Sequence, residues 1–420
     1  MSRFVIFTFT IVLLYLVHIK KVPLPEFIKT ELQAISASEN SRVEGLSSNP
    51  SCKLEEDDKL HYGFSKPMSQ HYEEYQTYLK NHPAIHIYDQ QRLSAANNKI
   101  MYNRIPKCGS ETINDAFGEY FAQQKENGNW LGWWRENPHE EGVRHDRDFY
   151  NRGTTNGFIR DYEGFQDRLI YIRHEPYLDF HKWPENANAT QPVYFNIVRK
   201  PSSRHISRWY YDRAGNFKSE ETGGLHAKDL RADWERNMTI EHALKQALEW
   251  KNPYRHSIAE ISSVMMNYLC GTAAWCNPDF NKDIYLLDET DMTAPIGNIY
   301  ARDQAMKNIR ENYIFVGILE QWDDNIEMLE YVFPEAFGPH IDRPGRQTFS
   351  EFFKEKGKEI SARYATVTKP KVEDWAKDIL EKVMLYENEI YEYAKMVFNV
   401  RLEHYRKLHG RSKANDNSEK

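Results

Sequence analysis

Two apolar segments of this chain are each followed directly by a turn and then by a helical pattern. Residues 193–198 (VYFNIV) precede Pro201 and a helical pattern over residues 202–211. Residues 100–102 (IMY) precede a turn that contains Pro and Gly and a helical pattern over residues 112–117. Strands that alternate with helices in this way are typical of a sheet connected by helices. The pattern therefore predicts an α/β fold with a central parallel sheet flanked by helices.

The rest of the chain extends the pattern. Further apolar runs of strand length lie at residues 169–172 and 313–317, and further helical patterns lie at residues 240–250, 322–333 and 372–398. Hydrophobic residues make up 40% of the chain and aromatic residues 14%, which is enough for a packed core. The formal net charge of −7 gives no general attraction to nucleic acid, so we expect no nucleic-acid partner. Any anionic ligand needs a local basic cleft.

An uncharged apolar segment, FVIFTFTIVLLYLVHI, occupies residues 4–19, with Arg3 before it and Lys20 and Lys21 after it. It is shorter than the ~20 residues of a usual membrane span, but flanking lysines can extend to the bilayer surface and secretory membranes are thin. A cleaved signal peptide is the alternative, although no small-x-small cleavage site follows the segment. The segment therefore predicts a transmembrane signal-anchor, whose orientation the balanced flanking charges do not determine.

The remaining sequence divides by composition. The polar residues 20–98 predict a stem, within which the Tyr-rich residues 71–78 predict a docking helix. Dense patterning over residues 99–405 predicts the main domain, and residues 406–420 predict a polar tail.

Two kinds of residue bear on the compartment. Asn188 and Asn237 each begin an Asn-X-Thr sequon and are candidate glycosylation sites, as in a lumenal domain. Cys270 and Cys276 are spaced too widely for a CxxC zinc or redox motif, but they can close a small disulfide loop. Such a bridge would persist in the secretory lumen.

The turn after residues 100–102 is a candidate anion site. Amides at the start of the following helix and the helix dipole favour an anion, and Gly109 permits a close approach of the backbone. Lys107, Ser110 and Thr112 supply further donors. The nucleoside-triphosphate motif GxxxxGK[ST] is absent, which disfavours a P-loop kinase that binds Mg²⁺ and ATP. An ordinary turn with a capping Ser or Thr is the alternative.

A second candidate anion site follows residues 193–198. Arg199 ends the predicted strand, Pro201 suits the first helical turn, and Ser207 lies two turns along the helix. Arg199 and Ser207 could clamp one phosphate, while a solvated basic helix face is the alternative. Two such sites on one sheet suggest a nucleotide with phosphates at both ends. This suits 3′-phosphoadenosine 5′-phosphosulfate (PAPS) better than ATP.

These motifs resemble those of the Golgi sulfotransferases that act on the 2-position of uronic acids in glycosaminoglycans. The resemblance spans roughly residues 99–398, and the KCGSxT form is more similar to the uronyl group of that family than to the heparan sulfate group. The matching stretches are YNRIPKCGS, QPVYFNIVR, CGTAAWC, FVGILE, TVTK and ENEIYEY, at residues 102–110, 191–199, 270–276, 315–320, 366–369 and 387–393.

This chain departs from the family pattern in two places. Lys200 stands where the family usually has Asp. Residues 127–151, which include Trp130, Trp133 and Trp134, have no counterpart. Those tryptophans suggest buried anchors of an insertion, with stacking on sugar faces as the alternative.

The resemblance implies a P-loop-like sulfotransferase domain that uses PAPS and no metal. His174, in RHEPYLDF, matches the base of the family, and Lys107 matches the cation at the bridging oxygen. An imidazole, with an ordinary pKa of ~6.5, suits proton abstraction, although by itself His174 is one His among 16. The donor contacts implied by the resemblance are Arg104, Lys107, Cys108, Gly109, Ser110, Glu111, Thr112, Arg199, Ser207, Thr368 and Lys369.

The implied activity is sulfation of the 2-hydroxyl of a uronic acid in dermatan or chondroitin sulfate. The implied location is the Golgi membrane, as a single-pass type II protein with a lumenal catalytic domain. Heparan sulfate is the alternative acceptor, and a catalytically silent relative that only binds a glycan is an alternative of another class. The choice between iduronate and glucuronate stays open, as does the oligomeric state, for which a homo-oligomer is one option.

Overall fold

A computed structural model describes residues 66–129, 132–136, 152–165, 168–214, 238–248, 264–276, 298–339, 345–364 and 370–410 of the 420-residue chain. All of them belong to one compact unit. The strands are β1 (Ile100–Asn103), β2 (Trp134–Glu136), β3 (Leu169–Arg173), β4 (Val193–Val198) and β5 (Tyr313–Ile318). The α-helices are α4 (Met68–Asn81), α5 (Ile85–Ala95), α6 (Ser110–Glu126), α7 (Arg152–Glu163), α8 (Pro201–Ala214), α10 (Ile240–Leu248), α12 (Val264–Cys270), α14 (Ile299–Glu311), α15 (Trp322–Val332), α16 (Pro334–Phe337), α17 (Phe349–Arg363), α18 (Asp374–Val383) and α19 (Leu385–Leu408). Two short 3₁₀ helices are η2 (Pro184–Asn186) and η3 (Ala274–Cys276).

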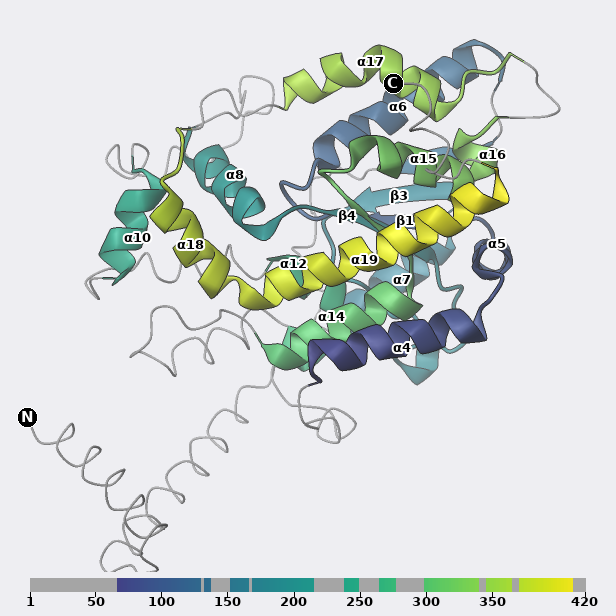
Figure 1. Ribbon diagram of the computed structural model, residues 1–420. Helices are drawn as coiled ribbons and strands as arrows, with labels where there is room; N and C mark the ends of the chain where they lie inside the picture. The colour runs from purple at the N-terminus through teal and green to yellow at the C-terminus, as the bar shows by residue number, and fades with distance from the viewer. Residues whose placement is uncertain are drawn as a thin grey trace, which may run out of the picture. The chain divides into compact units, whose positions relative to one another are not determined.

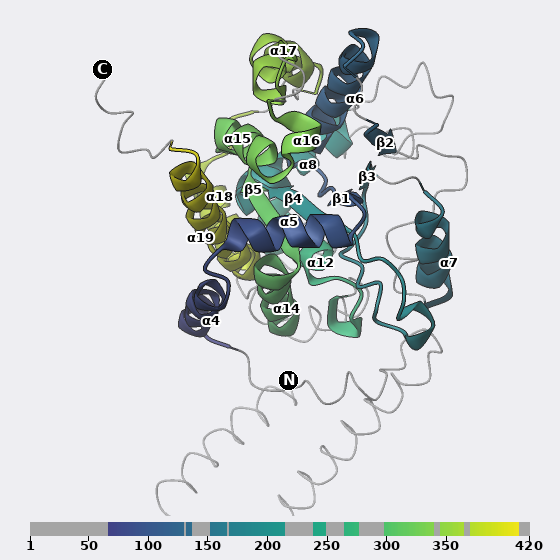
Figure 2. The same ribbon diagram turned by 90° about the vertical axis from the view of Figure 1, so that its right-hand side faces the viewer.

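The five strands form one parallel sheet in the order β2-β3-β1-β4-β5. Figure 1 labels β1, β3 and β4, and Figure 2 labels all five strands. This confirms the predicted α/β fold and the four predicted strands. The sequence did not predict β2, a three-residue strand at the edge of the sheet beside β3. Every residue of β1, β4 and β5 is buried, which explains why these strands are largely apolar in the sequence. The polar exceptions are Asn103 and Asn196, and the Asn196 side chain donates to that of Asn103 at 2.9 Å.

Helices cover both faces of the sheet (Figure 2). α6, α15 and α17 lie on one face, whereas α12 and α14 lie on the other. Aromatic rings link the strands to one another: Phe195 of β4 stacks on Tyr102 of β1 with ring centres 4.6 Å apart, and lies 5.4 Å from Phe315 of β5. On the α6 face, the Phe117 ring stacks 4.8 Å from that of Phe337 in α16. The high aromatic content therefore fills the space between sheet and helices.

The helical pattern predicted over residues 372–398 is two helices. α18 ends at Val383 and α19 begins at Leu385, with Met384 buried between them. α18 packs against α8 and α10 around a second apolar cluster that includes Trp209 and Leu380. α19 packs along β5 instead. The chain turns at Met384 because the two halves of the pattern cover different parts of the fold.

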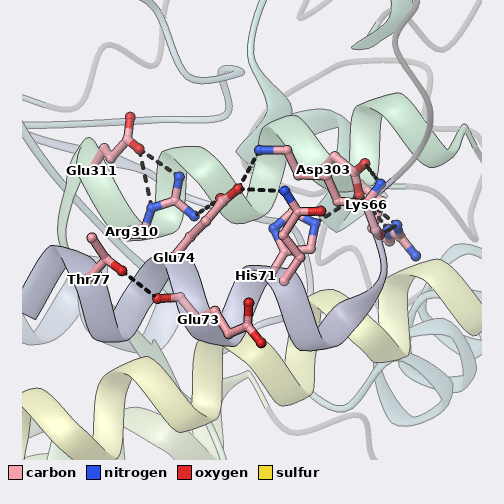
Figure 3. A network of polar contacts seen from close by, with 10 residues as sticks. Lys66, His71, Glu73, Glu74, Thr77, Asp303, Arg310 and Glu311 are labelled. Atoms are coloured by element: carbon pink, nitrogen blue, oxygen red, sulfur yellow. Dashed lines mark hydrogen bonds and ion pairs between the residues drawn. The ribbon is translucent and has the colours of Figure 1, made fainter.

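The docking helix predicted near the N-terminal end of the domain is present as α4. It joins α14 through polar contacts (Figure 3): His71 Nε2 lies 3.0 Å from Asp303 Oδ1, and Arg310 Nη1 donates to Glu74 at 2.7 Å. Burial would raise the pKa of Asp303, but its hydrogen bonds from His71, Lys66 and Arg302 hold that pKa below its ordinary value. α4 is therefore fixed to the domain by charged contacts.

The structure adds detail to the remaining predictions. α4 and α5 both pack on the main core, although they fall within residues 20–98, the range predicted as stem. Cys270 and Cys276 form the predicted disulfide, with Cα atoms 5.6 Å apart. Trp133 is buried, in keeping with an anchoring role.

Among the helices that the structure describes, none is long and apolar enough to cross a membrane. The predicted anchor at residues 4–19 lies outside the described residues, as do Trp130 and Asn237.

Candidate functional site

The strand order creates one edge of the sheet where three loops meet. β1 continues through α6 to β2 on one side, whereas β4 continues to β5 on the other. In a parallel sheet, a crevice opens outside the carboxyl ends of two neighbouring strands whose connections diverge in this way. The loops after β1 and β4 therefore flank the crevice, and the loop after β3 lies beside the loop after β1. These loops carry the residues predicted from the sequence.

The loop after β1 leads into α6 through a glycine that no other residue can replace without strain. Gly109 has a φ of 75°, and a Cβ atom there would lie 2.6 Å from Cδ1 of Leu319. α6 then begins at Ser110, which is buried together with Thr112. A helix N-terminus with close backbone access suits the anion that the sequence predicts at this loop. Arg104 of the loop forms an ion pair at 2.8 Å with Glu111 in the first turn of α6.

Lys107, in the first candidate anion site, contacts two residues of the second. Its φ of 65° is in the left-handed region, which is uncommon for a residue with a side chain. Its Nζ atom lies 3.5 Å from the centre of the Tyr211 ring on α8, and its backbone oxygen accepts a hydrogen bond from Arg199 Nη1 at 3.4 Å. The structure thus brings Lys107 and Arg199 together, as the phosphate-binding hypothesis requires.

The turn between β4 and α8 is held by two carboxylates from other elements. The backbone nitrogen of Lys200 donates to Glu320 Oε1 at 3.0 Å, just after β5. The Lys200 Nζ atom lies 2.8 Å from Glu381 Oε1 on α18, and Ser202 Oγ donates to the same oxygen at 2.9 Å. These contacts fix the turn that presents Arg199. Ser207, the predicted partner of Arg199, is buried two turns along α8.

A buried ion pair lies beneath α8. Arg204 Nη2 lies 3.7 Å from Glu387 Oε2 of α19, and both side chains are fully buried. Burial raises the pKa of Glu387 to about 7, although Arg204 and the backbone amide of Met266 oppose that shift. The thiol of Cys108 is also buried, which raises its pKa to about 12 against the opposing charges of Arg204 and Arg199. Cys108 is therefore an inert packing residue of the first loop.

His174 follows the last residue of β3 and is anchored to the loop after β1. Its Nδ1 atom lies 2.8 Å from the backbone oxygen of Arg104, and the Arg104 nitrogen donates to the Arg173 oxygen at 2.8 Å. A carbonyl oxygen only accepts, so Nδ1 is the donor, and the neutral ring then carries its lone pair on Nε2. This is the tautomer of a general base with a fixed orientation.

Some predicted residues are not placed at this site. Thr368 and Lys369 lie outside the described residues. Asn188 is exposed, as a glycosylation site requires. Across the described ranges, no group of three or more His, Cys, Asp or Glu side chains is arranged to hold a metal.

The sequence reasoning did not identify several residues that shape the site. Tyr211, Glu320, Glu381 and Glu387 all contact residues of the two anion elements. Glu320 and Glu387 lie inside stretches that match the family, FVGILE and ENEIYEY. The match could have marked both residues as candidates for the site. Nothing in the sequence pairs Glu381 with Lys200 or Tyr211 with Lys107. The first pair forms only when α18 packs beside the turn before α8, and the second only when α8 packs beside the loop after β1.

A surface hollow of about 450 Å³ lies elsewhere, between α4 and α14. Its lining includes Glu73, Glu74, Arg310 and Glu311, and Arg310 and Glu311 directly precede β5. The hollow is therefore at the opposite edge of the sheet from the loops described above. Arg310 is paired with both Glu74 and Glu311, and the lining holds no imidazole or thiol. The strand ends are the better candidate for a reaction centre.

The chain resembles known proteins over most of the residues that form this domain. The model of a sulfotransferase family matches residues 90–398. The human uronyl 2-sulfotransferase is 24% identical over 304 residues, which cover 72% of this chain and 63% of the human protein. The human heparan sulfate 2-O-sulfotransferase 1 is 24% identical over 309 residues, or 70% of this chain and 69% of that protein. A heparin sulfate O-sulfotransferase of Drosophila melanogaster is 23% identical over 308 residues, or 71% of each chain. The chain thus spans less than two thirds of the length of the uronyl relative.

Proposed function

The chain belongs to the sulfotransferase family, and we propose that it transfers a sulfuryl group from PAPS to the 2-hydroxyl of a uronic acid in a glycosaminoglycan. One observation carries the proposal: two candidate anion-binding elements and an oriented imidazole meet at one edge of the sheet. Lys107 and Arg199 belong to the two elements and contact each other, while His174 is anchored to the first of them. The names of the relatives support the same reaction class.

The residues at the strand ends fit a nucleotide with an anionic group at each end. The N-terminus of α6, with Gly109, Ser110 and Thr112, suits the 5′-phosphosulfate. Arg199 and Ser207 suit the 3′-phosphate. When bound, PAPS supplies an activated sulfuryl group and leaves as adenosine 3′,5′-bisphosphate.

Two side chains have chemical roles in the proposal. Nε2 of His174 accepts the proton of the acceptor hydroxyl, since Nδ1 is engaged with Arg104. The ammonium group of Lys107 offsets the negative charge that develops on the departing phosphate oxygen. Neither role requires a metal.

The identity of the acceptor polysaccharide is the more specific part of the proposal. Dermatan or chondroitin sulfate is our first choice, because the KCGSxT loop at Lys107 favours the uronyl group of the family. Heparan sulfate is the second candidate, since several relatives are named for it. A silent relative that only binds a glycan would not need the fixed tautomer of His174.

We also propose that the chain is a single-pass type II protein of the Golgi membrane with a lumenal domain. The apolar residues 4–19 with their flanking lysines and the sequon at Asn188 support this. The disulfide between Cys270 and Cys276 suits an oxidising lumen. Homo-oligomerisation is part of the same proposal, and sedimentation of the purified protein tests it.

A transfer assay tests the function. The full chain is incubated with ³⁵S-labelled PAPS and, separately, with chondroitin, dermatan and heparan sulfate, and the products are digested to disaccharides. We expect label on the 2-hydroxyl of a uronic acid in at least one polymer. Binding of adenosine 3′,5′-bisphosphate without any labelled product would identify a silent relative instead. Mg²⁺-dependent binding of ATP in place of the bisphosphate would identify a nucleoside-triphosphate enzyme.

A further inference from the structure

The side chain of Lys107 rests on an aromatic face that belongs to the second anion element. Its Nζ atom lies 3.5 Å from the centre of the Tyr211 ring, well inside the ~6 Å within which a cation and a ring attract each other. Tyr211 is half-buried on α8, one turn beyond Ser207. The ring is therefore part of the wall beside the proposed 3′-phosphate site.

The backbone of Lys107 is held in place as well. A φ of 65° is costly for a residue with a Cβ atom and persists only where surrounding contacts enforce it. Arg199 provides one such contact by donating to the Lys107 oxygen at 3.4 Å. Both ends of Lys107, its carbonyl group and its ammonium group, thus depend on two residues, Arg199 just after β4 and Tyr211 of α8.

An aromatic partner has a property that a carboxylate lacks. A flexible lysine side chain needs a contact that limits its rotamers before it can act from a fixed position. A carboxylate would provide that contact, but its negative charge would also repel an anionic donor. The face of a tyrosine ring attracts the ammonium group through its quadrupole and carries no net charge. It can therefore hold a lysine that must later face an anion.

We propose that Tyr211 is a positioning residue that holds the ammonium group of Lys107 at the mouth of the donor site. This inference rests on the proposed function for the identity of the reaction that Lys107 serves. The contact between the two side chains does not depend on it. In this role Tyr211 acts through Lys107.

The first experiment measures Lys107 in the full chain without any donor. The purified protein is labelled with a limiting amount of acetic anhydride, and mass spectrometry gives the labelling rate of Lys107 relative to exposed Lys125 on α6. A ring that stabilises the ammonium form lowers the amine reactivity. Tyr211→Leu should therefore raise the relative rate for Lys107 by about 2- to 30-fold, the range of such contacts. Tyr211→Phe should leave the rate near that of the wild type, because the phenyl face remains.

A shape-preserving variant keeps the test valid if Tyr211→Leu does not fold. Pentafluorophenylalanine at position 211 fills nearly the same space but reverses the charge distribution of the ring face. It should raise Lys107 labelling as leucine does. Equal labelling of Lys107 in the wild type and in whichever of these two variants folds would overturn the proposal.

Kinetics then separate positioning from mere packing. Tyr211→Leu should lower kcat with little change in the KM for PAPS, and Tyr211→Phe should restore kcat. A kcat equal to that of the wild type in Tyr211→Leu would overturn the positioning role. If the wild type shows no transfer to any glycosaminoglycan, the proposed function fails, while the labelling result still decides the contact between Tyr211 and Lys107.

Discussion

The Nδ1 atom of His174 lies 2.8 Å from the backbone oxygen of Arg104. This hydrogen bond joins the loop after β3 to the loop after β1, so the candidate base is oriented by the same segment that begins the first anion site. Because the carbonyl group can only accept, the contact also selects the tautomer with the lone pair on Nε2. The predictions below start from this arrangement.

We predict that His174→Ala keeps its affinity for adenosine 3′,5′-bisphosphate but loses turnover. The phosphate contacts lie on α6 and α8, whereas a positioned base contributes on the order of 10²–10⁴-fold in kcat. Calorimetry and the transfer assay measure the two quantities. His181→Ala is the matched control, because the exposed His181 ring contacts only the nearby Ala189 oxygen among the contacts described for it. A folded His174→Ala protein that retains more than about a tenth of the wild-type rate would remove His174 from this role.

We predict that Lys107→Ala and Arg199→Ala impair different quantities, kcat in the first case and donor affinity in the second. Lys107 serves the departing oxygen, so its loss should lower kcat more than donor affinity. Arg199 serves the 3′-phosphate and also supports the Lys107 backbone, so its loss should weaken donor binding first and lower kcat as a second effect. Calorimetry with adenosine 3′,5′-bisphosphate distinguishes them. Near-normal affinity in Arg199→Ala would refute the clamp.

The sequence predicts the sheet and the two candidate anion elements because both depend on local patterns. Buried parallel strands are largely apolar runs, and a glycine between a strand and a helix suits a phosphate loop. The division of α18 from α19 at Met384 could not be read in this way, because the apolar pattern continues across it while its two halves cover different elements.

The same limit applies within the site. Lys107, Arg199 and His174 follow strands and could be found from their positions. Tyr211 contacts Lys107 only because α8 packs beside the loop after β1, and Glu387 contacts Arg204 only because α19 packs beside α8. No sequence spacing encodes either contact. The resemblance to a family supplied the role of His174, which spacing alone does not distinguish from that of other histidines.

We predict that Gly109→Ala is more destabilising than Gly128→Ala. The two glycines flank α6 and have similar φ values, 75° and 71°, so both substitutions carry the cost of a left-handed alanine. Only at Gly109 would the new Cβ collide, at 2.6 Å from Leu319 and 3.3 Å from Trp322, while nothing lies within 4 Å at Gly128. Because the Leu319 side chain can partly move aside, we expect a difference of about 1 kcal/mol in the free energy of unfolding, measured in urea. Equal values would show that the loop has room for a side chain.

We predict a pH dependence of stability that originates at Glu387. Burial raises its pKa to about 7 from an ordinary 4.5, so between these values the folded state holds a proton that the unfolded state has released. The free energy of unfolding therefore falls as the pH rises through this window. The stability that the raised pKa of Glu387 contributes is complete only below the window. Glu387→Gln is neutral at every pH and should gain stability relative to the wild type from pH 5 to pH 8, as measured by denaturant unfolding. If the wild type gained instead, its ion pair with Arg204 would outweigh burial.

The last prediction concerns the ion pair between Lys200 and Glu381, whose atoms lie 2.8 Å apart. Both side chains are partly exposed, so the pair adds little to stability, but it holds the turn that presents Arg199. Lys200→Glu should therefore weaken binding of adenosine 3′,5′-bisphosphate by about 2- to 5-fold, the range of exposed pairs, with an unchanged melting temperature. The double variant Lys200→Glu with Glu381→Lys restores opposite charges and should recover most of the affinity.

Two comparisons make this charge exchange decisive. Lys377→Glu breaks another exposed pair on α18, with Asp374 at 2.8 Å, and should leave bisphosphate affinity unchanged because that pair is not attached to the turn. The added negative charge at position 200 also acts on the phosphate directly, and Glu381→Lys measured alone allows that direct effect to be separated from the coupling in a double-mutant cycle. A coupling free energy of zero means that the double variant binds the bisphosphate no better than the sum of the two single changes predicts. That result would show that Glu381 does not position the turn and that Lys200 acts on the donor by its charge alone.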